Sequence, residues 1–195
     1  GTPIQPQFLD FKKDLTIGKT SKNIPLIYKQ NTQDGLFNLV FRYEFGDEDD
    51  LRYGYAADYL NYIGTKKMDV SDINKAFYDL ACNYSVSTTY NTLQISLNGL
   101  NENLPKALKL MENVLKNAQA DKESWEQYVE QVEKGREDAK TDQKTNFNYL
   151  WNYCKYGKYN PARNDISIED LKKVNPQEYI NLLAGLNNLQ HTILY

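Results

Sequence analysis

Histidine and cysteine, two of the usual ligands of a catalytic zinc, are scarce in this chain. It contains one histidine, His191, and two cysteines, Cys82 and Cys154. A hydrolytic zinc site needs three protein ligands and an open position for water, and in one common arrangement two histidines one helical turn apart supply two of them. Because a histidine pair cannot form here, we exclude two-histidine zinc ligation within the chain. The cysteines lack metal-ligand and C-x-x-C spacing. We expect buried free thiols, although the sequence leaves a disulfide open.

The sequence does not support catalysis by a nucleophile and a general base either. We place His191 in a predicted strand, where a catalytic role would require a named nucleophile beside it. No serine or cysteine lies in a nucleophile motif such as G-x-S-x-G. A hydrogen-bonded or surface histidine is therefore the expected role.

The spacing of the acidic residues does not match a metal-binding site either. The run Gly46–Asp50 lacks the twelve-residue pattern of a calcium loop, and we expect it to cap the following helix. The glutamates in the stretch 123–137 are expected to form a solvated helix face. Asp58 could share a hard cation with one glutamate of that stretch, but such an ion needs several convergent oxygens that the spacing does not supply. The glutamates considered for that pairing are Glu126, Glu130 and Glu133.

The composition describes a globular domain without a nucleic-acid or membrane signature. The 195 residues are 41% hydrophobic and carry a net charge of −3, which suits one domain with a buried core. No basic stripe or RNP-like motif supports nucleic-acid binding, and no run is long enough for a transmembrane helix. The 16 tyrosines combine an apolar ring with a polar tip, so they suit either a half-exposed surface or an interface.

Hydrophobic periodicity predicts alternating strands and helices. An α+β fold follows, with an antiparallel or mixed sheet of five to six strands and helices packed on one face, forming a single domain over residues 1–195. Ser71 is the expected N-cap of the second helix, and Phe147, Leu150, Trp151 and Cys154 form the apolar stripe of a later one. The predicted strands are 15–18, 24–29, 36–45, 84–88, 93–97 and 189–195, and the helices lie within 54–65, 71–80, 101–116, 122–144, 147–154, 167–171 and 175–184.

Residues 54–65, Gly-Tyr-Ala-Ala-Asp-Tyr-Leu-Asn-Tyr-Ile-Gly-Thr, follow a strand and an acidic turn. That order, and the later sequence of a polar helix, an aromatic helix, an Asn-Pro pair and Ile-Ser-x-Glu-x-Leu, resembles the insulinase/pitrilysin family of inverted zinc metallopeptidases. Active members carry H-x-x-E-H on this helix. Anchoring on Gly54 places Ala57, Leu60 and Asn61 at the motif positions, whereas anchoring on Gly64 places Tyr55, Asp58 and Tyr59 there. The resemblance is therefore to a catalytically inactive domain.

The resemblance implies a role without catalysis by this chain. Family members enclose a peptide between two halves, of which one holds zinc and the other completes the chamber and assists substrate binding. This chain is expected to be an inactive domain excised from a longer polypeptide, with no cofactor of its own and with zinc in another domain. Its expected partners are the other domains of that polypeptide and a peptide substrate. A non-proteolytic scaffold or assembly subunit of the same fold is the alternative. The bacterial periplasm or cell envelope, or secretion, is the expected location.

Three tyrosines on the helix at 54–65 receive a more specific hypothesis. Tyr55, Tyr59 and Tyr62 share a helical face by three-four spacing. Such a stripe usually packs on a sheet. If the equivalence to the active helix holds, part of the same face would line a wall toward the substrate or a partner.

Overall fold

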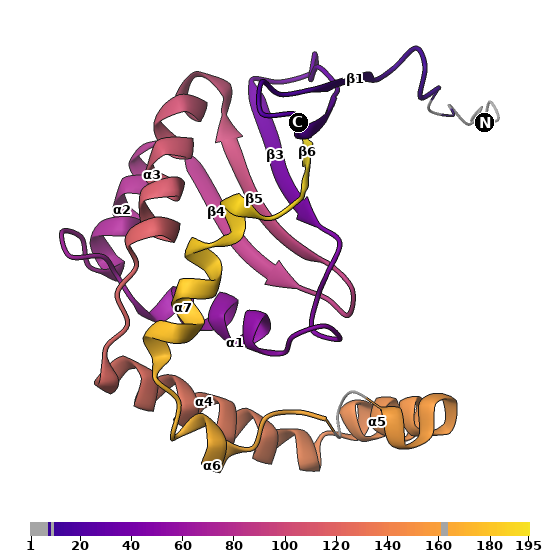
Figure 1. Ribbon diagram of the computed structural model, residues 1–195, viewed down its shortest axis with the longest axis vertical. Helices are drawn as coiled ribbons and strands as arrows, with labels where there is room; N and C mark the ends of the chain where they lie inside the picture. The colour runs from indigo at the N-terminus through magenta and orange to yellow at the C-terminus, as the bar shows by residue number, and fades with distance from the viewer. Residues whose placement is uncertain (1–7, 9, 161–163) are drawn as a thin grey trace, which may run out of the picture.

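The computed structural model describes residue 8, residues 10–160 and residues 164–195, and it has the predicted α+β architecture (Figure 1). A six-stranded mixed sheet runs in the order β1-β2-β6-β3-β5-β4, so that β1 and β4 form its edges. The strands are β1 (Thr16–Lys19), β2 (Pro25–Tyr28), β3 (Leu36–Tyr43), β4 (Cys82–Thr88), β5 (Leu93–Leu100) and β6 (Thr192–Leu194).

Successive side chains along the central strands point to opposite faces of the sheet, and one of these faces is buried and apolar. On β3, Phe37, Leu39 and Tyr43 are buried, and the antiparallel register sets Leu39 opposite Leu97 and Tyr43 opposite Leu93 on β5. These apolar residues form the core beneath the helices. The opposite face carries exposed polar side chains at Asn38, Asn83, Ser85, Ser87 and Asn98.

Helices cover the apolar face in one layer. α1 (Arg52–Tyr59) and α2 (Val70–Asp79) lie against β4, and α3 (Leu104–Asn117) lies against β5. α7 (Pro176–Ala184) packs across α1 and α3 (Figure 1). The prediction of helices on one face is thus confirmed for these four helices.

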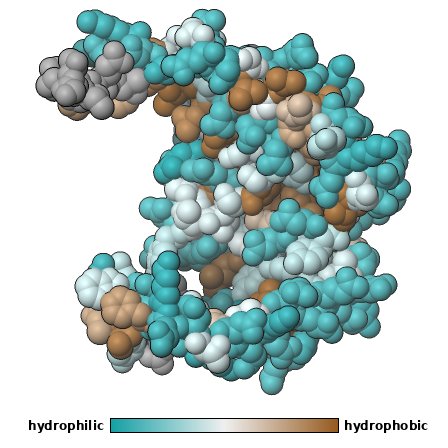
Figure 2. Space-filling model, turned by 180° about the vertical axis from the view of Figure 1, so that it is seen from behind, coloured by the Kyte–Doolittle hydropathy of each residue, from teal (hydrophilic) through white to brown (hydrophobic). Residues whose placement is uncertain are grey.

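The remaining helices form a second layer at one end of the domain. α4 (Lys122–Thr141) runs beneath α1 and α7, α6 (Ile168–Leu171) lies along α4, and α5 (Gln143–Tyr156) projects away from the sheet (Figure 1). Seen from behind, the surface is hollowed between α5 and the end of the molecule that carries β1 and β2 (Figure 2). No helix of the described residues is both long and apolar enough to cross a membrane.

Several local predictions need correction. The N-cap of α2 is Asp69 rather than Ser71, because Asp69 and Asp72 exchange backbone-to-carboxylate bonds in a capping box. The predicted strand at 189–195 shortens to Thr192–Leu194, which leaves His191 just before it. Cys82 is buried as expected, whereas Cys154 is exposed, and both are free thiols.

Candidate functional site

The helix that the sequence resemblance compares with a zinc-binding helix is short in this chain. α1 ends at Tyr59, a 3-10 turn, η1, continues over Leu60–Tyr62, and Ile63 is extended. The preceding acidic turn supports the start of the helix, because the Asp50 carboxylate accepts a bond from the backbone N–H of Arg52 at 3.0 Å and lies 2.7 Å from its guanidinium. This arginine lowers the pKa of Asp50.

Neither assignment of the motif positions gives a ligand set. In the first, Ala57 and Leu60 are buried and apolar, and the exposed Asn61 donates its amide to the carbonyl of Asp58 at 3.1 Å. In the second, Asp58 offers a carboxylate between two tyrosines. Partial burial raises the pKa of Asp58, and the nearby charge of Asp47 raises it further. Within residues 8, 10–160 and 164–195, no three histidine, cysteine or acidic side chains converge on a metal position.

The three glutamates of α4 that were considered as partners for Asp58 face solvent or a lysine. Glu126 and Glu130 are exposed, and Glu133 pairs with Lys172 at 3.0 Å. This agrees with the predicted solvated helix face.

Tyr59 belongs to the core. Its side chain has no exposed surface, its hydroxyl donates to the carbonyl of Asp121 at 3.0 Å and lies 2.8 Å from Ser124 Oγ, and its ring meets Trp125 edge-on at 4.8 Å. These contacts fix α1 onto the first turn of α4. Of the three tyrosines proposed to line a wall, Tyr59 therefore has no surface to offer in this domain.

Tyr55 and Tyr62 lie nearer the surface. Tyr62 is 40% exposed and its ring packs at 5.3 Å from that of Tyr128. Tyr55 is half-buried, its hydroxyl donates to the carboxylate of Asp165, and it accepts a bond from Arg136 Nη2 at 2.6 Å. Burial, followed by the bond to Asp165, raises the pKa of Tyr55. The two residues thus border a surface, but the bonds of Tyr55 are internal.

The open edge of β4 is the feature of this region best suited to hold a peptide. Thr89 N–H bonds the carbonyl of Thr92 at 2.8 Å, and Leu100 N–H bonds that of Ala81. In an antiparallel ladder, bonded pairs alternate with non-bonded ones. Residues 81, 83, 85, 87 and 89 therefore turn their backbone groups toward β5. The N–H and C=O groups of Tyr84 and Val86 consequently point outward, and no described residue bonds them.

A cleft lies beside the same edge. It has a volume of about 390 Å³ and is bounded by η1, α2 and the first residues of β4. Leu60 and Asn61, from one assignment of the degenerate motif, form one wall, and Phe77, Cys82 and Tyr84 form another. The cleft and the outward backbone groups together would accept an extended chain and one or two of its side chains.

His191 lies away from this region. It is 8% exposed, Nδ1 lies 2.8 Å from the carbonyl of Leu189, and its ring packs at 5.0 Å from that of Tyr43. It is a buried, hydrogen-bonded histidine, which agrees with one of the two roles expected for it.

Comparisons with known proteins identify the fold. No protein-family model matches the sequence, and no curated protein matches it. Among solved structures, the chain resembles a peptidase M16 inactive domain from Pseudomonas fluorescens, with a TM-score of 0.74 and 16% identity over 93% of this chain and 46% of that one.

Two larger proteases show the same likeness. The periplasmic protease PqqL from Escherichia coli gives a TM-score of 0.73 at 10% identity, over 95% of this chain and 21% of that one. The ferredoxin protease FusC, solved in complex with Arabidopsis ferredoxin, gives 0.75 at 11% identity over 98% and 23%. The chain spans less than half the length of each of these structures. It therefore has the fold found in the inactive domain of an M16 peptidase and in related proteases.

Proposed function

We propose that this chain is a non-catalytic domain of a larger, insulinase-type zinc peptidase. In that role it forms part of the wall around a peptide and binds the peptide along the edge of β4, while another domain holds the zinc. The other domains of the polypeptide and an extended peptide are its partners. The description of PqqL as periplasmic supports a periplasmic or extracellular location.

One observation carries the proposal: β4 is an edge strand whose outward N–H and C=O groups at Tyr84 and Val86 lack partners among the described residues. An extended peptide satisfies such groups by adding a strand, without a need for a particular sequence. Because the described residues place no set of metal ligands beside this edge, the proposed role is to hold a peptide without cleaving it.

Hydrogen exchange at single amides tests the binding mode. In the free chain, the amides of Tyr84 and Val86 should exchange quickly, whereas those of Asn83 and Ser85 should be protected by β5. Addition of an extended, unlabelled peptide should slow exchange at Tyr84 and Val86 and leave Asn83 and Ser85 unchanged. Unaltered exchange at the outward pair, with a peptide that the full polypeptide cleaves, would contradict binding at this edge.

A second experiment concerns catalysis. The chain incubated with peptide and zinc should yield no cleavage, because hydrolysis needs three ligands and an open position on the metal. Reproducible turnover that is lost on chelation would overturn the non-catalytic assignment. A chain that binds no peptide but forms a stable complex with other domains would favour the assembly subunit.

A further inference from the structure

The helix α5 has a polar side that is partly buried and an apolar side that is exposed, which is the reverse of the usual arrangement. Thr145 and Asn152, seven residues apart, are its partly buried positions. The predicted apolar stripe lies on the other side by helical periodicity, where Phe147 is 63%, Leu150 61% and Trp151 54% exposed. The helix thus turns polar side chains inward and apolar ones outward. Contiguous exposed apolar surface of this kind marks an interaction site.

Local hydrogen bonds define both ends of α5. Asp142 caps its first turn by accepting from the N–H of Thr145 at 2.7 Å, and Asn146 donates to the carbonyl of Lys140 at 2.9 Å. Gly157, with a φ of 57°, ends the helix in a left-handed conformation that favours glycine. These bonds define both ends of the helix, and α5 contacts the neighbouring α4, with the apolar stripe on its exposed side.

Beyond its capping residue Asp142, the charged side chains of α5 and of the turn that follows it are all lysines. Residues 143–160 contain three lysines and no aspartate or glutamate, although the whole chain has a net charge of −3. Lys155 Nζ lies 5.3 Å from the centre of the Trp151 ring, and Lys158 Nζ lies 5.2 Å from that of Tyr159. A side chain that packed on either ring would meet an ammonium group beside it. The surface therefore complements a ligand that is both apolar and negatively charged.

The arrangement of the aromatic rings favours a polypeptide over a lipid bilayer. Tyr149, Tyr153 and Tyr156 form a second exposed row by three-four spacing, on a different side of the helix from Phe147 and Trp151. A helix that lies in a membrane interface buries one apolar face in one plane, so a single plane cannot take up both rows. A peptide can lie along one row, and tyrosine hydroxyls can bond its backbone.

We propose that α5 binds acidic, apolar segments of an extended polypeptide, through Phe147, Leu150 and Trp151 and through Lys155 and Lys158. This inference rests on the peptide-binding role proposed above and names the class of peptide. α5 borders the hollowed side of the molecule (Figure 2), and it lies outside the cleft at β4. A long peptide could therefore contact α5 with a segment that the cleft does not hold.

Two labelled peptides of about a dozen residues test the inference. They share the same leucine and phenylalanine positions and carry either glutamate or lysine between them. Fluorescence anisotropy with the whole chain should show binding of the acidic peptide that is about tenfold tighter at low salt, with the difference shrinking as ionic strength rises. Emission of Trp151 should shift to shorter wavelength on binding, since Trp125 is already buried at 3% exposure.

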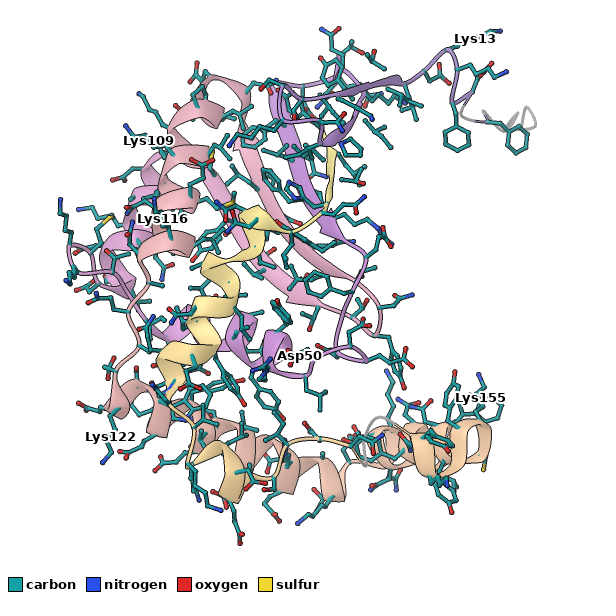
Figure 3. The ribbon with its side chains drawn as sticks, viewed as in Figure 1. Lys13, Asp50, Lys109, Lys116, Lys122 and Lys155 are labelled. Atoms are coloured by element: carbon teal, nitrogen blue, oxygen red, sulfur yellow. The ribbon has the colours of Figure 1, made fainter. Side chains whose placement is uncertain are left out.

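Charge reversal supplies the matched variants. Lys155→Glu with Lys158→Glu should abolish the preference for the acidic peptide. Lys109→Glu with Lys116→Glu makes the same change of net charge on α3, far from Lys155 (Figure 3), and should alter affinity less than about twofold. All four lysines are exposed, so both double variants should fold. Equal binding of the two peptides, or equal losses in the two variants, would refute the inference.

The remaining outcomes separate this inference from the proposed function. If peptide protects the β4 amides but Phe147→Ser with Trp151→Ser has no effect on affinity, the α5 inference fails and the proposed function stands. If neither peptide binds and neither protects β4, both fail. If neither peptide binds and the chain instead binds vesicles of phosphatidylglycerol and phosphatidylcholine through Trp151, α5 is a membrane contact and the inference is wrong.

Discussion

Arg136 Nη2 lies 2.9 Å from Asp165 Oδ2, and the hydroxyl of Tyr55 contacts both residues. The same guanidinium donates through Nη1 to the carbonyl of Ile166 at 2.8 Å. One side chain of α4 thereby joins α1 to the segment that leads into α6. The group ties the helical layer that covers the sheet to the second layer, which carries α5.

Replacing Arg136 with methionine should weaken this connection. The variant loses an ion pair that is partly exposed and a bond to a carbonyl, so urea denaturation should show a free energy of unfolding lower by about 1–2 kcal/mol. Lys140→Met is the control, because its pair with Glu137 is 67% and 63% exposed, and should cost less than about 0.5 kcal/mol. If both variants lost a similar free energy of unfolding, the bonds of Arg136 would stabilise the fold no more than an exposed ion pair does.

Substitutions of Tyr59 test whether this residue stabilises the core or contacts a substrate. Tyr59→Phe retains the ring against Trp125 but leaves Ser124 Oγ and the carbonyl of Asp121 without the phenol, so unfolding should become easier by about 1–2 kcal/mol. Tyr62→Phe, at a 40% exposed position, should change stability by less than about 0.5 kcal/mol. In the full polypeptide, Tyr59→Ala should unfold the domain and leave cleavage selectivity unchanged among molecules that remain folded. Altered selectivity at unchanged stability would restore Tyr59 to the substrate wall.

The fold was largely predictable because its elements have strong periodic signals. Leu93, Ile95 and Leu97 alternate with polar residues, and that pattern indicates which face of the sheet is buried. The short helices predicted within 167–171 and 175–184 likewise lie where the sequence predicts them, and Ser167 and Asn175 cap them. By contrast, the N-cap of α2 was misplaced because Asp69 and Ser71 are both good caps, and only the bond from Asp72 selects between them.

The candidate site was less predictable, since it depends on neighbours distant in sequence. The contacts of Tyr55 with Arg136 and Asp165 span 81 and 110 residues, and no local spacing reveals them. The exposure of the α5 stripe was also hidden, because an apolar stripe at three-four spacing predicts burial without naming what buries it. The charge of residues 143–160 was the available signal, as it sets this helix apart from the acidic remainder of the chain.

Stability should fall at alkaline pH because burial raises the pKa of several tyrosines, among them Tyr43 and Tyr84. Burial raises the pKa of Tyr43 and of Tyr84 to about 12 each, above the value near 10 of the unfolded chain. Between these values the unfolded chain has released a proton that the folded chain retains, so the free energy of unfolding decreases by up to about 1.4 kcal/mol per pH unit for each tyrosine. Below pH 10 this contribution is fully present.

Urea denaturation from about pH 8 to pH 11.5 measures that slope, and phenolate absorbance reports the ionisation directly. Tyr84→Phe should make the slope above pH 10 shallower by up to about 1.4 kcal/mol per pH unit, because one of the tyrosines with a raised pKa is lost. A surface substitution, Tyr78→Phe, at an 82% exposed position, should leave it unchanged. A slope that is the same in all three proteins would show that these buried phenols do not govern the alkaline loss.

Two glycines should respond to alanine in opposite directions. At Gly99, with a φ of +149°, a Cβ would lie 2.5 Å from the Ala81 carbonyl oxygen and 2.5 Å from Cys82 Sγ. Gly99→Ala should therefore destabilise the chain by more than about 3 kcal/mol. Gly135 lies inside α4 with nothing within 4 Å of its Cβ position, so Gly135→Ala should stabilise by about 0.5–1 kcal/mol.

The same pair of variants connects stability with the peptide-binding edge. Gly99 faces Cys82 at the first register position of β4, so the clash should displace the beginning of the edge strand. Gly99→Ala should then weaken peptide protection of the Tyr84 amide even where the chain remains folded at low temperature, whereas Gly135→Ala should leave it intact. Thermal denaturation and amide exchange on the two variants provide the measurement. Intact protection of Tyr84 in a folded Gly99→Ala chain would mean that the peptide is held elsewhere.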